Sequence, residues 1–345
     1  MMGDKRNLYG IDLMKFIAAM LVVAGHVRPF LSFSLTLDVF VIHVLARVTI
    51  QFFFMTAGFL LFRKIEFPLR GNKQNNKIIF NYCKRVLVLY AIWMTIYVGV
   101  ALTYFVSKVG YSPYGFYLFY RFLQGASHLW YLSALIIAVV LVYWTLRYIS
   151  FKKTLVLGFV LYIVGLFGDA YYGIAHSIGI GAPVKAYLDL FATSRNGVFF
   201  GFFFVAMGAY FAKSGFRIKN PFPPFIVCMV LLTVEVFMLR AYSEPLNFNL
   251  LFFALPASVC LFSGMLEIKL KERRIYRWLR DGSLIVYLVH PLFIMLLPIG
   301  LSSLGIRWLY SNSLMQYLLV AGGSYIIAWV LIYATKKWPG LHIFY

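Results

Sequence analysis

Ten apolar runs, each close to twenty residues long, follow one another along most of the 345-residue chain. A helix of about 20 residues crosses the ~30 Å of hydrocarbon in a bilayer, and lipid offers the backbone no other hydrogen-bond partners. The runs therefore predict a polytopic helical bundle. The predicted spans are Leu8–Val27, Arg47–Phe62, Arg85–Val106, His128–Leu146, Thr154–Tyr172, Asn196–Ala212, Phe222–Leu239, Leu250–Leu266, Ser283–Leu301 and Tyr317–Thr335.

The distribution of charge supports a membrane protein and sets its orientation. The chain is 62% hydrophobic and 12% charged, whereas soluble domains carry about 25% charged residues. A net charge of +21 would suggest nucleic acid as a partner of a soluble protein. Here 23 of the 32 Lys and Arg residues fall in alternate connections, as the positive-inside rule requires. We predict an all-α membrane bundle with both termini in the cytoplasm and no nucleic-acid partner.

The connections between the runs are short, and the longest hold about twenty residues. Residues 1–345 are therefore expected to form a single transmembrane domain without a soluble domain. Cys83, Cys228 and Cys260 lack the spacing of metal ligands or of a disulfide framework. No metal site is predicted.

Three ionisable residues of the first run are expected on one stripe of its helix. Asp12 and Lys15 are three residues apart, so they share a face and can pair. His26 follows Lys15 by eleven residues, which at ~100° per residue places it within ~20° of alignment and ~16 Å further along the axis. Charged groups inside a membrane usually line a polar interior. The alternative is an ion pair that serves packing alone, with His26 as a hydrogen-bonded packing residue.

Further polar residues stand at the ends of other runs. Arg47 opens the second span, where an arginine can also snorkel to the surface. His128, Trp130 and Tyr131 open the fourth, a pattern that an interfacial aromatic belt shares. Arg195 and Asn196 precede a Phe-rich span, where the alternatives are ordinary loop charge and a helix cap.

Two ionisable residues inside the apolar runs, His290 and Glu235, have no assigned chemistry. His290 precedes Pro291 in the ninth span, and we favour a structural role because proline leaves a backbone carbonyl group without its donor. The pattern around Glu235 does not decide its role. Asp169 and His43 lie near the ends of runs or in loops, and we assign them no function.

Several of these segments together resemble the acyltransferase 3 family. The resemblance covers essentially the whole chain, with the motifs in the expected order. Lys15 stands where arginine is commonest, and Gln51 replaces the usual proline; a lysine does not offer the bidentate contact of an arginine. The matching segments are Lys15 to His26, Arg47 to Phe59, His128 to Leu132, Arg195 to Gly208 and Tyr287 to Pro291.

The resemblance implies a multi-pass enzyme of the bacterial cytoplasmic (inner) membrane. Family members move an acyl group, usually acetyl from acetyl-CoA, to a hydroxyl of a cell-surface glycan or a lipid-linked sugar. Some members are glycan O-acetyltransferases, and others look like the membrane half of the serine racemases associated with vancomycin resistance. The expected partners are the lipid bilayer, acetyl-CoA or another acyl-CoA, and the glycan or lipid-linked acceptor.

On this basis we expect His26 to be the general base, because histidine has a suitable unperturbed pKa. Lys15 and Asp12 are expected to hold the thioester arm or to order the helix. Substrate contacts are expected from Arg47, His128, Trp130, Tyr131, Arg195 and Asn196. Among these, Arg47, Arg195 or Asn196 would stabilise the oxyanion. The basic segments 63–85 and 269–280 are expected to bind the CoA phosphates.

Two other classes of protein fit the same sequence. A transporter of a serine-like amino acid or of a glycolipid would use the polar stripe as its substrate path. A non-catalytic membrane scaffold would carry the same charges for packing alone.

Overall fold

The computed structural model describes residues 8–109 and 127–345. Every regular element in these residues is a helix, as the apolar runs predict. The first half contains α1 (Tyr9–Val27), α2 (Leu35–His43), η1 (Leu45–Val48), α3 (Thr49–Phe62), α4 (Lys73–Val109), η2 (Ser127–Leu129), α6 (Trp130–Leu146) and α7 (Phe151–Phe167). The second half contains α8 (Tyr172–Ser177), α9 (Gly181–Phe191), η3 (Gly197–Gly201), α10 (Phe202–Ser214), α11 (Phe222–Tyr242), α12 (Ala254–Glu267), α13 (Arg274–Ser303), η4 (Arg307–Tyr310), α14 (Ser313–Lys337) and η5 (Pro339–Phe344).

Each of the ten predicted spans contains a helix. Within the described residues, seven helical segments are long and apolar enough to cross a membrane: α1, the run from α2 to α3, α4, the run from η3 to α10, α11, α13 and α14. The other three predicted spans hold α6 and α7, of 17 residues each, and α12, of 14 residues. The chain is a polytopic membrane helix bundle.

Some helix ends differ from the predicted spans. α4 begins at Lys73 and α13 at Arg274, well before the apolar residues that predict them. Lys, Arg and Gln are good helix formers and continue the helix beyond the apolar run. α12 begins at Ala254, four residues after the predicted start at Leu250, because the backbone N–H groups of Asn249 and Leu250 bind a side chain instead.

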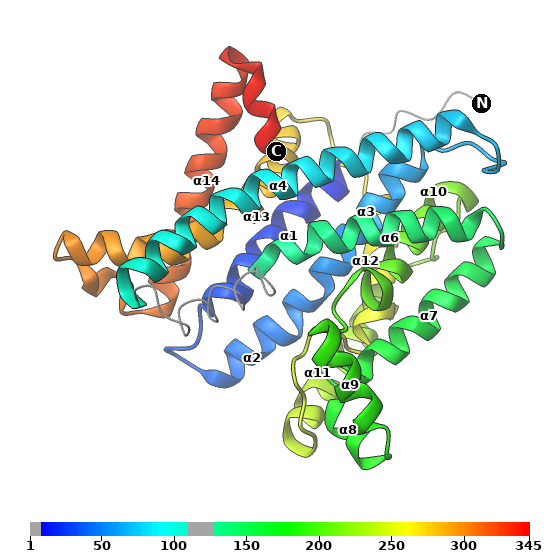
Figure 1. Cartoon of the computed structure of the whole chain (residues 1–345), viewed down its shortest axis with the longest axis horizontal. Coiled ribbons are helices and arrows are strands. Elements are labelled where there is room, and N and C mark those ends of the chain that lie inside the picture. The colour runs from blue at the N-terminus through cyan, green and yellow to red at the C-terminus, as the bar shows by residue number, and fades with distance from the viewer. Residues whose placement is uncertain (1–7, 110–126) are drawn as a thin grey trace.

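The short helices α8 and α9 were not predicted. They follow one another between α7 and η3 and lie beside each other in the lower right of Figure 1. α9 exposes Leu190 and Phe191, and Gly181 is its one buried residue. Too short for a span, this segment has no hydropathy signal that separates it from a loop.

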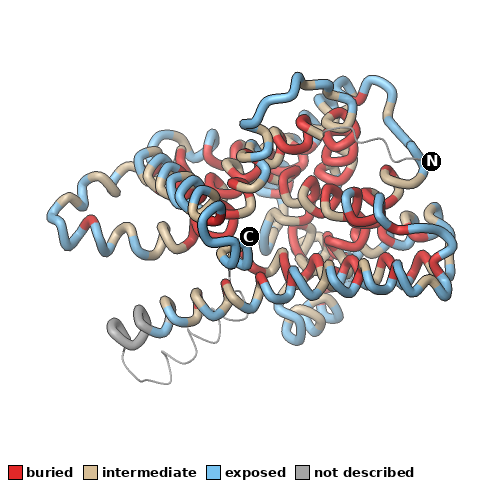
Figure 2. Tube along the Cα trace, turned by 90° about the horizontal axis from the view of Figure 1, so that it is seen from above, coloured by how far each residue is buried: buried red, intermediate tan, exposed pale blue. Residues whose placement is uncertain are grey.

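The helices pack around a central crossing of α3 and α10. Figure 2 shows the buried residues gathered in the middle of the bundle, with exposed positions on its periphery. A Cβ atom added to Gly58 of α3 would collide with the Val205 carbonyl oxygen, and one added to Gly208 of α10 would collide with that of Met55. Small residues let the two backbones touch, as they do in many membrane helix pairs. Around this pair, α1 packs on α13 and α13 packs on α14.

The bundle has two ends that matter for the site. The connections after α3, α6, α10 and α12 lie at one end, which we call the inner end because the sequence places these basic connections in the cytoplasm. α1 ends, and η3 and α12 begin, at the opposite outer end. At the outer end Arg28 pairs with the fully buried Asp38 at 2.8 Å, which fixes the turn between α1 and α2.

Candidate active site

His26 lies in the last turn of α1 and lines a cavity at the outer end of the bundle. The cavity, which we call the outer cavity, has a volume of about 140 Å³. By its surface area in the protein alone, His26 is an exposed residue. Polar groups surround it: Arg47, Gln51, Trp130, Arg195 and Asn249 also line the outer cavity. The polar stripe predicted for the first helix thus faces the interior at its outer end.

Arg47 and Arg195 are brought together by a single side chain. Arg47 Nη1 donates to Asn249 Oδ1 at 2.9 Å, and Arg195 Nη1 donates to the same oxygen at 3.1 Å. Arg47 also contacts His43 Nδ1 at 3.1 Å, and Arg195 lies 4.6 Å over the Trp130 ring. Arg47 therefore does not snorkel to the surface, and Arg195 is not ordinary loop charge.

Asn249 was missed by the sequence analysis, together with its partner Asp169. Asp169 Oδ1 accepts from the backbone N–H groups of Asn249 at 2.6 Å and Leu250 at 3.1 Å, and Oδ2 accepts from Asn249 Nδ2 at 3.0 Å. Asp169 thereby fixes the orientation of the Asn249 amide. Burial lowers the pKa of the Arg195 guanidinium, and the negative charge of Asp169 opposes this shift.

Three histidine rings form a row from the outer cavity into the bundle. The ring centroid of His26 lies 5.1 Å from that of His290, and His290 lies 5.4 Å from His128. His290 is fully buried, and its Nδ1 lies 3.0 Å from the Val286 carbonyl oxygen, which agrees with a structural role. His128 is 2% exposed and packs between Tyr97 and Tyr287, so it is not part of a lipid-facing belt.

A second cavity reaches the same region from the inner end. This inner cavity has a volume of about 480 Å³. Lys15, Arg85 and Arg280 line its wall together with Asp281, which pairs with Arg280 at 2.9 Å. The rest of the wall is largely apolar and aromatic, and includes Ile50, Phe53, Leu60, Leu89, Tyr131 and Tyr287. Ile50 lines both cavities, so its side chain stands between them. Lys15 thus faces the inner cavity and His26 the outer one.

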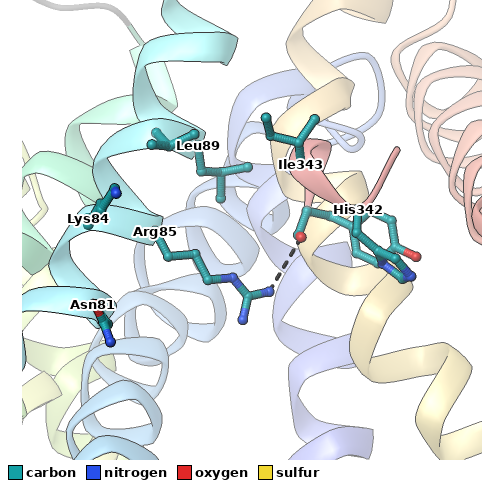
Figure 3. A pocket seen from close by; sticks show the side chains of 8 residues that line it. Asn81, Lys84, Arg85, Leu89, His342 and Ile343 are labelled. Carbon is teal, nitrogen blue, oxygen red and sulfur yellow. Dashed lines mark hydrogen bonds between the residues drawn. The ribbon is translucent and has the colours of Figure 1, made fainter. Parts of the chain in front are cut away.

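The mouth of the inner cavity is basic. Beside it lies a surface pocket of about 350 Å³ between α4 and η5, shown in Figure 3, where Arg85 points towards the C-terminal segment. Arg85 Nη2 donates to the Tyr345 carbonyl oxygen at 3.4 Å, and Lys84 and His342 also line this pocket. Of the two basic segments, only the last cations therefore lie at this opening: Lys84 and Arg85 of segment 63–85, and Arg280 of segment 269–280.

The remaining predicted site residues do not all lie at the same cavity. Trp130 lines the outer cavity and Tyr131 the inner one, although they are neighbours. Asn196 caps the turn of η3 by accepting from Val198 N and Phe199 N, and it does not line either cavity. This is the capping role that the sequence offered as the alternative to substrate binding.

Asp12 and Glu235 serve the framework in different ways. No ion pair joins Asp12 to Lys15 in the part of the chain that the structure describes, although Asp12 lies near Lys15, Arg280 and Asp281. Glu235 accepts from Phe252 N at 2.6 Å, Phe253 N at 2.9 Å and the Tyr171 hydroxyl at 2.8 Å. Glu235 therefore satisfies the N–H groups at the start of α12.

No group of three His, Cys, Asp or Glu side chains within residues 8–109 and 127–345 is placed to hold a metal ion. The described residues place an imidazole and two guanidinium groups at the outer cavity, and Ile50 separates this cavity from the inner one.

Comparison with known protein families and curated sequences finds one family model and several relatives. A family model described as an acyltransferase domain matches residues 8–333. An amino-acid racemase of Enterococcus faecalis is 30% identical over 346 residues, which cover 96% of this chain and 47% of the relative. A second amino-acid racemase of this species is 29% identical over 96% of this chain and 46% of the relative. A serine/alanine racemase of Enterococcus gallinarum is 29% identical over 82% of this chain and 40% of the relative.

The chain spans about half the length of the curated relatives it matches. The absence of a soluble domain therefore stays a prediction. No solved structure matches the chain.

Proposed function

The chain belongs to the acyltransferase 3 family, and we propose that it transfers an acyl group, acetyl in the first instance, from acyl-CoA to a hydroxyl acceptor. The acyl-CoA enters from the inner end, and the acceptor occupies the outer cavity. The acceptor class suggested by the family resemblance is a cell-surface glycan or a lipid-linked sugar. The proposed site is the bacterial cytoplasmic membrane.

One observation carries this proposal. The inner and outer cavities approach from opposite ends and share Ile50, with His26 lining the outer one. An acyl-CoA is a cytoplasmic molecule, whereas cell-surface glycans, the proposed acceptors, lie outside the cell membrane. Two cavities that approach each other on either side of one side chain would let the two reactants meet at Ile50, without moving either across the membrane.

The lining of the inner cavity suits a CoA thioester. Its wall is largely apolar and aromatic, which favours the pantetheine arm and the acyl chain. Lys84, Arg85 and Arg280 stand at or near its mouth and would bind the phosphates. Lys15, further inside, would contact the polar groups of the arm.

The proposed chemistry uses His26 as the general base. His26 takes the proton of the acceptor hydroxyl while the hydroxyl oxygen attacks the thioester carbonyl carbon. The new C–O bond forms, and Arg47 or Arg195 stabilises the oxyanion. The C–S bond then breaks, and the departing CoA thiolate takes the proton from the His26 imidazolium. The enzyme returns to its starting state without a covalent intermediate.

The test is the His26→Ala variant in purified, reconstituted protein with labelled acetyl-CoA and in cells by mass spectrometry of surface glycans and lipids. We expect the variant to lose acyl transfer while its membrane insertion and thermal stability stay unchanged. His176→Ala is the matched control, because His176 lies on α8 away from both cavities. Unchanged product acetylation in the His26→Ala variant would remove the central claim.

A second function, transport of a small amino acid, is favoured by the same pair of cavities, since a transporter also needs access from both ends. Relatives that are named amino-acid and serine/alanine racemases point to amino acids. Uptake of labelled serine into vesicles that contain no acyl-CoA would support transport. Release of free CoA only when an acceptor is added would support the acyltransferase.

A further inference from the structure

The positive charge of the outer cavity is only partly balanced by negatively charged residues nearby. Arg47 and Arg195 both line it, and none of the described residues in its wall is acidic. Asp169 stands behind Asn249 and does not line the cavity. Two guanidinium cations and one carboxylate leave an excess of one positive charge, because arginine stays protonated in proteins.

The two guanidinium groups also lack some of their acceptors. They share one amide oxygen, Asn249 Oδ1, and Arg47 Nη2 also contacts His43 Nδ1. The Nε atoms of both Arg47 and Arg195 are buried without a hydrogen-bond partner. A buried donor without an acceptor is costly, and more so when it is charged. An anion in the outer cavity would supply the missing acceptors.

Gln51 provides an independent sign of a polar ligand. Its side chain is 0% exposed and forms part of the outer cavity wall. Neither Oε1 nor Nε2 has a hydrogen-bond partner. A buried amide of this kind can both donate to and accept from a ligand, so it calls for a group such as an amine or a hydroxyl beside the anion.

We propose that the outer cavity binds a carboxylate that is carried by the acceptor itself, with its hydroxyl or amino group nearby. Arg47 and Arg195 bind the carboxylate, Gln51 binds the neighbouring polar group, and His26 faces the hydroxyl. A monoanion matches the single excess charge, whereas a phosphate dianion exceeds it. The cavity of about 140 Å³ holds roughly five waters at ~30 Å³ each, which is room for a group of a few heavy atoms.

The same carboxylate chemistry has two sources, a free small hydroxy or amino acid and the acidic sugar of a glycan. The word acceptor in this inference rests on the proposed acyl transfer, but the binding of a carboxylate does not. Binding is therefore measured without acyl-CoA.

The experiment is ligand binding to the full-length chain in detergent, followed by thermal unfolding and by equilibrium binding of labelled probes. The probes are serine, serinamide, glycerate, glyceramide, glucuronate and inorganic phosphate. We expect each carboxylate that fits to bind at least tenfold more tightly than its matched amide. Preference for serine and glycerate identifies a small acid, and preference for glucuronate identifies a glycan carboxylate; both support the inference.

Variants locate the site. Arg47→Gln, Arg195→Gln and Gln51→Leu are each expected to weaken carboxylate binding at least tenfold, and the control Arg307→Gln, an exposed outer arginine, is expected to leave it unchanged. Where an arginine variant does not fold, the comparison of acid with amide on the unchanged chain and the Gln51→Leu variant still decide. Amides that bind as well as acids, or phosphate that binds more tightly than glycerate, would overturn the inference.

The two proposals fail separately. Carboxylate binding that persists in a chain without acyl transfer would leave this inference standing and remove the proposed function. Acyl transfer to serinamide or glyceramide as efficient as transfer to the acids would leave the proposed function standing and remove this inference.

Discussion

The amide of Asn249 holds the outer cavity in its observed geometry. Its oxygen accepts from Arg47 and Arg195, and its nitrogen donates to Asp169. Two like charges side by side repel each other, and a neutral acceptor between them compensates only part of that repulsion. The remaining positive charge near Asn249 therefore favours the binding of an anion.

Replacement of Asn249 by aspartate tests this preference at nearly constant side-chain volume. The new carboxylate lies between the two guanidinium groups and neutralises the excess charge of the cavity, although it loses the hydrogen bond that Asn249 Nδ2 donates to Asp169. We expect the KM or Kd of a carboxylate acceptor to rise at least tenfold, which is about 1.4 kcal/mol, with little change for acyl-CoA. Steady-state kinetics with each substrate varied in turn measure both.

Asn312→Asp is the matched control for this prediction. Asn312 caps α14 at the outer end by accepting from Leu314 N and Met315 N. Aspartate caps a helix as well as asparagine does, so acceptor and acyl-CoA kinetics should both stay unchanged. An Asn249→Asp variant that binds the acceptor as well as the unchanged chain does would contradict the role assigned to the excess charge.

Some of these site residues could be predicted from the sequence and others could not, for a physical reason. His26, Lys15, Arg47 and Arg195 stand out because a charge next to an apolar run is costly unless it lines a polar interior. Asn249 lies in a polar loop, where an asparagine costs nothing and signals nothing. Its role depends on Asp169, eighty positions earlier, and a single sequence carries no sign of that contact.

Among the helices, the crossing of α3 and α10 sets the position of the site. α3 continues from η1, which carries Arg47, and α10 continues from η3, which follows Arg195. The contact of Gly58 with Val205 and that of Gly208 with Met55 bring the two backbones together. The distance between the two guanidinium groups is therefore linked to how closely these helices approach.

The Gly58→Ala variant tests this crossing. The added Cβ meets the backbone carbonyl of Val205, which cannot rotate away. We expect the free energy of unfolding to fall by about 1–3 kcal/mol, the usual cost of overpacking, and the melting temperature in detergent to fall with it. Gly322→Ala on α14 is the control, because a Cβ there meets nothing within 4 Å. Equal melting temperatures for the two variants would argue against close packing at Gly58.

The start of α12 depends on Glu235 of α11. Its carboxylate accepts from two N–H groups at this helix start and from the Tyr171 hydroxyl. These residues adjoin the loop that carries Asn249. Glu235 thus connects the stability of α12 with the geometry of the outer cavity.

The Glu235→Ala variant should lower both stability and activity. It leaves two N–H groups without acceptors, and bonds to a charged group contribute about 1.5–3 kcal/mol each. We expect the melting temperature and kcat to fall together, as measured by thermal unfolding and acyl-transfer assays. Glu244→Ala, at an exposed position of the following loop, should change neither. A Glu235→Ala chain with normal stability would show that another acceptor replaces the carboxylate.

Helices were the most predictable elements, because lipid forces every spanning segment to satisfy its own backbone. The apolar run of Phe222–Leu239 already predicts α11, and only its last turn was missed. By contrast, α8 and α9 lie outside that constraint and have no such signal. The number of residues by which α13 precedes its apolar run likewise depends on helix propensity outside the bilayer and not on hydropathy.

Across the whole molecule, the two cavities lie towards opposite ends of the bundle. Lys15, Arg85, Arg280 and Asp281 are the charged residues of the inner cavity, and Arg47 and Arg195 give the outer cavity its charge. Ile50, between them, is apolar and has no group that could take part in proton transfer. Its side chain therefore acts, if the proposed reaction is correct, only through the space that it fills.

This argument yields a test of the whole arrangement, the Ile50→Trp variant. The indole fills the junction that Ile50 lines from both sides, so the thioester can no longer reach the hydroxyl. We expect acyl transfer to fall at least 100-fold, about 2.7 kcal/mol in barrier height. Binding of acyl-CoA in the inner cavity and of a carboxylate in the outer cavity should each persist, because neither set of cations is altered.

Ile50→Ala is the matched control for the junction. It widens the passage and should keep or raise the rate of acyl transfer, with a higher rate of thioester hydrolysis because water also gains access. Thermal unfolding of both variants separates a blocked junction from a misfolded bundle. Full activity in a folded Ile50→Trp chain would mean that the reactants meet elsewhere, and loss of both binding activities would mean that the indole disturbs the cavities themselves.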